Sequence, residues 1–198
     1  FLTAAKVGGI KANSDYPADF IYQNLMIATN VIHASYKVNV KKLLNLGSSC
    51  IYPKHAKQPL KEEYLLTGEL EPTNEPYAIA KIAAIKLCQY YNDQYDTNFI
   101  SLMPTNLYGP NDNFDLKTSH VVPALIRKFV EAKSYSKPSV TVWGSGKPKR
   151  EFLYVNDLAD ACLYFMNKID APDIDQFVNI SKGKDVTIEE LAKIIKDL

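Results

Sequence analysis

Short apolar segments alternate with longer segments of helical periodicity along most of the chain. The strand-like segments are residues 1–5, 42–49, 98–104, 140–144 and 177–181. The helical segments are residues 17–37, 77–95, 119–133, a stretch from Asn156 or Asp157 to about Lys168, and a last helix that Thr187 and Glu190 open with a capping box. Such alternation is typical of an α/β domain with a mostly parallel, doubly wound sheet and helices on both faces. We therefore predict this fold class.

The start of the chain lacks a motif that many such domains carry. An α/β sheet that binds a dinucleotide normally begins with a G-x-G-x-x-G turn between its first strand and helix. The adjacent Gly8 and Gly9 do not supply this turn. Two interpretations stay open: the domain binds no dinucleotide, or the turn lies upstream of Phe1. Because the chain begins within a strand-like segment and without methionine, we interpret it as a fragment that lacks the N-terminal glycine-rich loop.

Composition excludes several function classes. A formal net charge of +1 argues against nucleic acid or an anionic membrane as the main partner. No apolar run approaches the length of a membrane span, and no signal peptide opens the chain. Cys50, Cys88 and Cys162 are odd in number and form no C-x-x-C pair, so we expect neither disulfides nor a metal site. We expect a cytoplasmic protein.

The helix expected at residues 77–95 begins with Tyr77 and carries Lys81 four residues later. Side chains at this spacing share one helix face, and an ammonium beside a phenol lowers the pKa of the phenol. The positive N-terminal end of the helix acts in the same direction. A lone Y-x-x-x-K pair is more typical of an exposed helix surface, so the rest of the chain decides its meaning.

Three motifs, one of which contains this pair, provide its context. They are LGSSCIYP at residues 46–53, EPYAIAK at 75–81 and MPTNLYGP at 103–110. Their order and spacing resemble those of the extended short-chain dehydrogenase/reductases. Together with VWGSGKPKREF at residues 142–152, they are similar to the GDP-L-fucose synthase family within that superfamily. The resemblance extends from Phe1 to about Asp160, and fewer residues match after that position.

The resemblance implies a Rossmann-like fold and a specific reaction. Residues 1–110 would be the C-terminal part of the dinucleotide-binding domain, and residues 111–198 part of a smaller substrate-binding region, interleaved with the last Rossmann elements. The implied activity is the NADPH-dependent conversion of GDP-4-keto-6-deoxy-D-mannose to GDP-L-fucose. This reaction epimerises C3 and C5 and then reduces the C4 ketone, so the chain would be a multifunctional enzyme of nucleotide-sugar biosynthesis.

The resemblance also implies roles for individual residues. Ser48, Tyr77 and Lys81 would carry out the reduction, in which Tyr77 protonates the C4 oxygen. Cys50 and His120 would serve epimerisation, which needs an acid and a base on opposite faces of the sugar; for Cys50 to act as base, its pKa would have to be depressed. The residues expected to bind the cofactor are Ser48, Ser49, Lys81, Pro104, Thr105, Asn106, Leu107 and His120. Those expected to bind the GDP-sugar are Lys128, Trp143 and Arg150.

Several alternatives stay open. Asn24 matches a family asparagine near the active site, but helix surface polarity explains it equally well. A nucleotide-sugar 4-epimerase or dehydratase of the same superfamily would share Tyr77 and Lys81, though not the need for Cys50 and His120. A non-catalytic nucleotide-binding protein on the same fold is a further alternative. For the intact protein we expect a homodimer, because the family pairs the helices at residues 17–37 and 77–95 across a symmetric interface.

Overall fold

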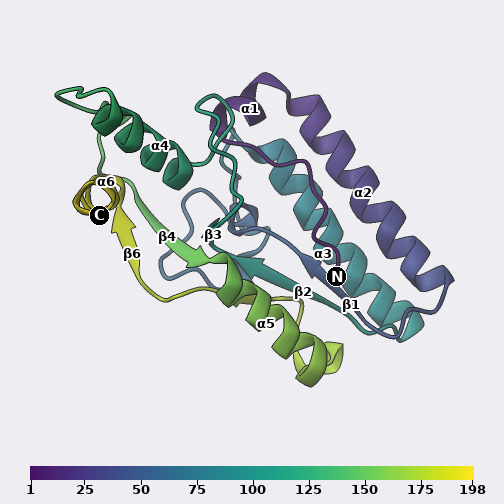
Figure 1. Ribbon diagram of the computed structural model, residues 1–198. Coiled ribbons are helices and arrows are strands. Elements are labelled where there is room, and N and C mark those ends of the chain that lie inside the picture. Colours follow the sequence, from purple (N-terminus) through teal and green to yellow (C-terminus); the bar gives the residue numbers. More distant parts are fainter.

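The computed structural model describes residues 1–198 and shows an α/β arrangement (Figure 1). The helices are α1 (Ile10–Asp15), α2 (Pro17–Lys37), α3 (Glu75–Tyr95), α4 (Val121–Ser134), α5 (Val155–Lys168) and α6 (Ile188–Asp197). The strands are β1 (Leu43–Leu46), β2 (Phe99–Pro104), β3 (Asn106–Tyr108), β4 (Lys149–Tyr154), β5 (Val178–Ile180) and β6 (Asp185–Thr187). Three short 3-10 turns lie at η1 (Ser49–Ile51), η2 (Glu62–Tyr64) and η3 (Ala171–Asp173).

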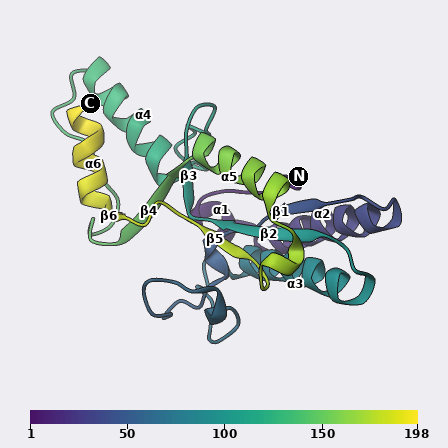
Figure 2. The same ribbon diagram turned by 90° about the horizontal axis from the view of Figure 1, so that it is seen from below.

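The main sheet has the order β1-β2-β5, and all its pairs are parallel. Helices α2 and α3 cover one face of this sheet and α5 covers the other, as Figures 1 and 2 show. The predicted fold class is therefore confirmed.

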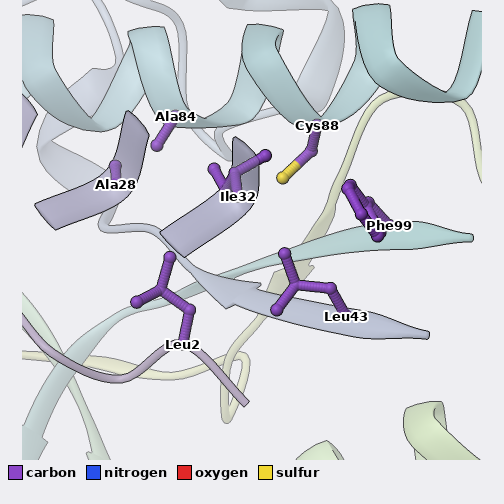
Figure 3. Packing of buried hydrophobic residues seen from close by; sticks show 7 residues of the cluster. All are labelled: Leu2, Ala28, Ile32, Leu43, Ala84, Cys88 and Phe99. Carbon is purple, nitrogen blue, oxygen red and sulfur yellow. The ribbon is translucent and has the colours of Figure 1, made fainter. Parts of the chain in front are cut away.

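Alternate residues of β1 and β2 supply the two sides of the core. Leu43 and Phe99 face α2 and α3, where they pack with Ile32 and Cys88 (Figure 3). The neighbouring residues of each strand point to the opposite face and pack in the α5 cluster. Burying one large aliphatic side chain contributes roughly 1.5–3 kcal/mol. Because both faces of these strands are buried, apolar residues are favoured at successive positions, and the strand sequences are continuous apolar runs.

A smaller unit lies beside the main sheet. Strand β4 pairs in parallel with β3 and antiparallel with β6. Helices α4 and α6 pack together through Val122, Leu125 and Leu191, and Figure 2 shows them at the end of the molecule away from α2. The capping box of Thr187 and Glu190 opens α6 as predicted. The proposed domain division at residue 110 stays a prediction.

Three expectations about the elements were wrong in part. In residues 1–5 only Leu2 pairs, through a single parallel bridge to Asn45. Residues 140–144 form no strand, because Val142 packs against the α4 and α6 cluster and the chain turns at Gly144 with a positive φ of 78°. Helix α5 begins at Val155 without a side-chain cap.

Helix α1 and strands β3, β4 and β6 were not predicted from the sequence. The sequence of β4 begins with the charged residues Lys149, Arg150 and Glu151, which hide its strand character. Pairing with β3 and β6 outweighs this weak local preference, since strand propensity depends strongly on tertiary context.

No helix of the chain is both long enough and apolar enough to cross a membrane.

Candidate active site

A pocket of about 400 Å³ lies where the main strands end. Gly47 follows β1 and Pro104 ends β2, and both line it. Ligands of open α/β sheets bind at the carboxyl ends of parallel strands, so this is the expected place for a site. The predicted residues that line this pocket are Ser48, Ser49, Tyr77, Pro104, Thr105, Asn106, Leu107 and His120.

Tyr77 enters the pocket from the first turn of α3. Its ring meets Phe20 of α2 edge-on, with ring centroids 6.5 Å apart. Burial raises the pKa of the Tyr77 phenol, the nearby Cys50 thiol adds to this rise, and a hydrogen bond with the Ser48 side chain opposes it. The expected lowering of this pKa is therefore wrong, because burial outweighs the effects that favour the phenolate.

Lys81 is not among the residues that line the pocket. The residue is only 8% exposed, and its Nζ donates a 2.8 Å hydrogen bond to the carbonyl oxygen of Leu46 at the end of β1. The Nζ is 5.7 Å from the centroid of the Tyr77 ring. Burial lowers the pKa of Lys81, and the charge interaction with Cys50 opposes this shift. Lys81 thus joins α3 to the strand end that presents Ser48.

Cys50 lies in η1, two residues after Ser48, and is not among the residues that line the pocket. Burial raises the pKa of its thiol to about 11, although Ser48 and the Lys81 ammonium both act to lower it. The depressed pKa that a basic role needs is therefore absent from this state of the protein. A thiol with this pKa keeps its proton at neutral pH.

His120 occupies the N-cap position of α4 and lines the pocket with Tyr77. Its side chain makes no capping hydrogen bond. The three residues expected to contact the GDP-sugar are not among the residues that line this pocket. Lys128 donates to the carbonyl oxygen of Thr141 at 3.1 Å, and its Nζ lies 4.5 Å from the centre of the Trp143 ring.

A second hollow, of about 250 Å³, lies between α4, α6 and residues 142–146, and neither Lys128 nor Trp143 lines it. Arg150 is exposed on β4 and donates to the carbonyl oxygen of Lys149 at 2.7 Å. The structure therefore brings Lys128 and Trp143 together, at a place distinct from the Tyr77 pocket.

Comparison with known proteins identifies the family. The model of the NAD dependent epimerase/dehydratase family matches residues 1–181. The chain belongs to this family. GDP-L-fucose synthase of Escherichia coli K12 is 58% identical to it, in an alignment that covers 98% of this chain and 63% of the relative. GDP-L-fucose synthase 1 of Arabidopsis thaliana is 60% identical, over 100% of this chain and 60% of the relative.

The chain is also similar in sequence and fold to a solved structure. MlghC, a GDP-mannoheptose C4 reductase from Campylobacter jejuni with NADP bound, is 44% identical and superposes with a TM-score of 0.89. That match covers 98% of this chain and 67% of MlghC. The chain spans about three fifths of the length of the two curated relatives.

Two asparagines of this epimerase/dehydratase chain differ in what their side chains do. Asn24 is buried, accepts from the Lys6 backbone at 2.9 Å, and donates to the carbonyl oxygens of Lys6 and Phe20 at 3.0 and 2.7 Å. All its polar atoms are thus satisfied by the backbone, which favours a structural role. Asn13 of α1, which sequence reasoning missed, lines the Tyr77 pocket. It lies in a short helix without periodicity, so no local signal marks it.

Proposed function

We propose that the intact protein converts GDP-4-keto-6-deoxy-D-mannose to GDP-L-fucose with NADPH. The observation that carries this proposal is the geometry at the end of β1, where Ser48 lines one pocket with Tyr77 and His120, and Cys50 follows Ser48 by two residues in η1. One strand end thus serves a group suited to reduction and a group suited to epimerisation. The 58% and 60% identity to GDP-L-fucose synthases supports the same reaction.

The pocket suits a polar, partly apolar ligand such as NADPH. Thr105 Oγ1 is buried and has no hydrogen-bond partner, although it lines the pocket, so a polar ligand group would satisfy it. The pocket residues proposed to hold the cofactor are Ser48, Ser49, Pro104, Thr105, Asn106, Leu107 and His120, and Lys81 is the one member of the expected set that does not line the pocket. When bound, NADPH supplies the hydride that reduces C4.

Reduction needs a proton at the C4 oxygen, and Tyr77 is proposed to give it. A raised pKa keeps the phenol protonated at neutral pH, which is the form that donates. The Ser48 hydroxyl then hydrogen-bonds the oxygen on which negative charge develops. Lys81, fixed by the Leu46 carbonyl, lies close enough to the ring to stabilise the phenolate that remains.

Epimerisation needs a proton to leave carbon beside the ketone and another to arrive on the opposite face. The electron pair of the broken C–H bond moves toward the C4 oxygen, where Ser48 and Tyr77 can stabilise it. Cys50 as thiolate is proposed to take the proton and His120 to deliver its replacement. Because the Cys50 thiol has a pKa of about 11, its basic form is scarce at neutral pH.

The proposal also covers substrate binding, the oligomeric state and the cellular compartment. The Lys128–Trp143 pair and Arg150 are proposed to hold the GDP part of the substrate, through charge and through the aromatic face. A homodimer in the cytoplasm is proposed for the intact protein, with the free thiols of Cys50, Cys88 and Cys162 fitting a reducing compartment.

The test is deuterium uptake from solvent at C3 and C5 of the keto sugar, followed by mass spectrometry of the reduced product. Cys50→Ser should suppress uptake, and His120→Asn should yield a C4-reduced sugar with wrong or missing inversion. Cys88→Ser is the matched control, because Cys88 is a buried thiol of the α2–α3 core that interacts with Ser101, whereas Cys50 interacts with Ser48 and Lys81. Uptake at the wild-type rate in both site variants would contradict these roles.

A second candidate is C4 reduction of a GDP-sugar without epimerisation. The raised pKa of Cys50 favours it, and so does the similarity to the C4 reductase MlghC. Reduction of the keto sugar by the wild type with no deuterium in the product would establish this candidate. A 4-epimerase or dehydratase would leave NADPH unconsumed, and a non-catalytic protein would leave the sugar unchanged.

A further inference from the structure

Asn13 is a buried polar residue of the pocket to which the proposed chemistry gives no role. It is only 5% exposed and lines the same pocket as Tyr77 and His120. Its Nδ2 donates to the carbonyl oxygens of Gly8, at 2.9 Å, and Gly9, at 3.1 Å. Its Oδ1 has no hydrogen-bond partner. A buried acceptor of this kind is rare and calls for an explanation.

The two backbone carbonyls settle which end of the Asn13 amide is which. Carbonyl oxygens only accept hydrogen bonds, so the amide NH₂ must face Gly8 and Gly9. The reverse orientation would place Oδ1 against two other acceptors and leave both donors unused. Oδ1 is therefore a fixed acceptor, held in place before any ligand arrives.

The segment that Asn13 holds packs against the chain leading to His120. The Gly9 amide donates to the carbonyl oxygen of Thr118 at 3.1 Å. A Cβ atom added to Gly9 would lie 3.0 Å from the carbonyl oxygen of Ser119, so the two backbones are in close contact. Under the proposed function, His120 contacts the cofactor and also delivers a proton to the sugar, so the segment that Asn13 holds adjoins a group that acts on the sugar.

We propose that Asn13 is a substrate-binding residue whose Oδ1 accepts a hydrogen bond from a ring hydroxyl of the sugar. This inference rests on the proposed function, because it takes a GDP-hexose as the ligand. A hydroxyl is a neutral donor that matches a fixed neutral acceptor, whereas phosphate and ketone oxygens are acceptors and would be repelled. The keto sugar carries hydroxyls at C2 and C3, so Asn13 selects for one of these two groups.

The experiment measures binding by calorimetry in the intact protein. The ligands are GDP-mannose and its 2-deoxy and 3-deoxy analogues, and the proteins are the wild type, Asn13→Ala and Asn24→Ala. The wild type should bind one deoxy analogue about tenfold more weakly than GDP-mannose, as expected for one lost hydrogen bond to a buried partner. Asn13→Ala should bind that analogue and GDP-mannose equally.

Asn24→Ala is the matched control, because Asn24 is also a buried asparagine bonded to backbone but does not line the pocket. It should keep the tenfold discrimination. Wild-type protein that binds both deoxy analogues as tightly as GDP-mannose would overturn the proposal, whether or not Asn13→Ala folds. Equal loss of affinity for all three ligands in Asn13→Ala would also overturn it, since that result describes a structural role for the NH₂ group.

A further arm separates the sugar from the cofactor. The 3-acetylpyridine analogue of NADP lacks the carboxamide N–H donors of nicotinamide, and its binding should not depend on Asn13. Selective loss of discrimination against this analogue in Asn13→Ala would assign Oδ1 to the cofactor and overturn the sugar assignment. Absence of any GDP-sugar binding to the wild type would instead overturn the proposed function itself, and this inference with it.

Discussion

Opposing influences on one phenol define the chemistry at Tyr77. Burial and the Cys50 thiol raise its pKa, and the Ser48 side chain lowers it. The outcome is a protonated tyrosine at neutral pH, suited to give a proton and not to take one. Lys81, with a pKa lowered by burial, is the nearby cation that a phenolate would need after the proton has left.

Replacing Tyr77 with phenylalanine removes the hydroxyl group that donates this proton and leaves the rest of the side chain unchanged. We expect Tyr77→Phe in the intact protein to keep its affinity for NADPH and to lose turnover by about 10²–10⁴-fold, the usual contribution of a general acid. Consumption of NADPH with the keto sugar measures this. Tyr135→Phe is the control, because Tyr135 is 72% exposed just after α4, does not line the pocket, and should be neutral. Turnover near the wild-type rate in Tyr77→Phe would contradict the assignment.

The raised pKa of Cys50 predicts how epimerisation depends on pH. Only the thiolate takes a proton, and its fraction grows as pH rises toward the pKa of about 11. We expect Cys50-dependent deuterium uptake to increase roughly tenfold for each pH unit between about pH 7 and pH 9. The measurement compares wild type with Cys50→Ser at each pH. A flat profile would mean that Cys50 is not the base, or that substrate binding lowers its pKa.

At the scale of elements, the side chain of one distant lysine binds the C-terminal carbonyl groups of α5. Lys42 precedes β1, and its Nζ donates to the carbonyl oxygens of Phe165, Met166 and Ile169 at the C-terminus of that helix. It also forms a 3.0 Å ion pair with Asp170. The last carbonyls of a helix have no partners within it, and a cation there also complements the helix dipole.

Removing this ammonium should loosen the contact between α5 and the sheet. We expect Lys42→Met to lower the free energy of unfolding by about 1.5–3 kcal/mol, the range for hydrogen bonds to a charged group. Lys41→Met is the matched control, because Lys41 is exposed and adjacent in sequence. Urea denaturation followed by circular dichroism measures both. Equal midpoints for the two variants would show that water replaces Lys42 at no cost.

Local signals explain which elements the sequence predicted. Helix α2 has an apolar stripe and a proline in its first turn, and Thr187 with Glu190 marks the start of α6. Strand β4 and helix α1 lack such signals, because pairing and packing with distant residues hold them in place. The site follows the same division. Motif spacing predicted residues of the pocket, whereas the pKa directions of Tyr77 and Cys50 depend on burial, which only the folded chain determines.

At the scale of the whole molecule, α2 and α3 form an outer layer with an unusual surface. They lie side by side over one face of the main sheet (Figure 1). Large side chains stay exposed on them, among them Tyr22 at 64% and Tyr90 at 59%. Within the layer the His33 ring contacts the Tyr91 hydroxyl at 2.6 Å, and the Tyr36 and Tyr95 rings stack. Exposed aromatic residues on adjacent rigid helices are typical of an interface.

This layer is where we expect two copies of the protein to meet. A symmetric dimer would use the same patch on both copies, so one substitution changes the interface twice. We expect the intact protein to be dimeric at micromolar concentration, and Tyr22→Glu or Tyr90→Glu to raise the dimer dissociation constant by about tenfold or more, since aromatic residues dominate interface energies. Light scattering over a dilution series measures this. Tyr135→Glu is the matched control, because Tyr135 is 72% exposed just after α4, outside this layer. A monomeric wild type, or a dimer that only Tyr135→Glu weakens, would place the interface elsewhere or exclude it.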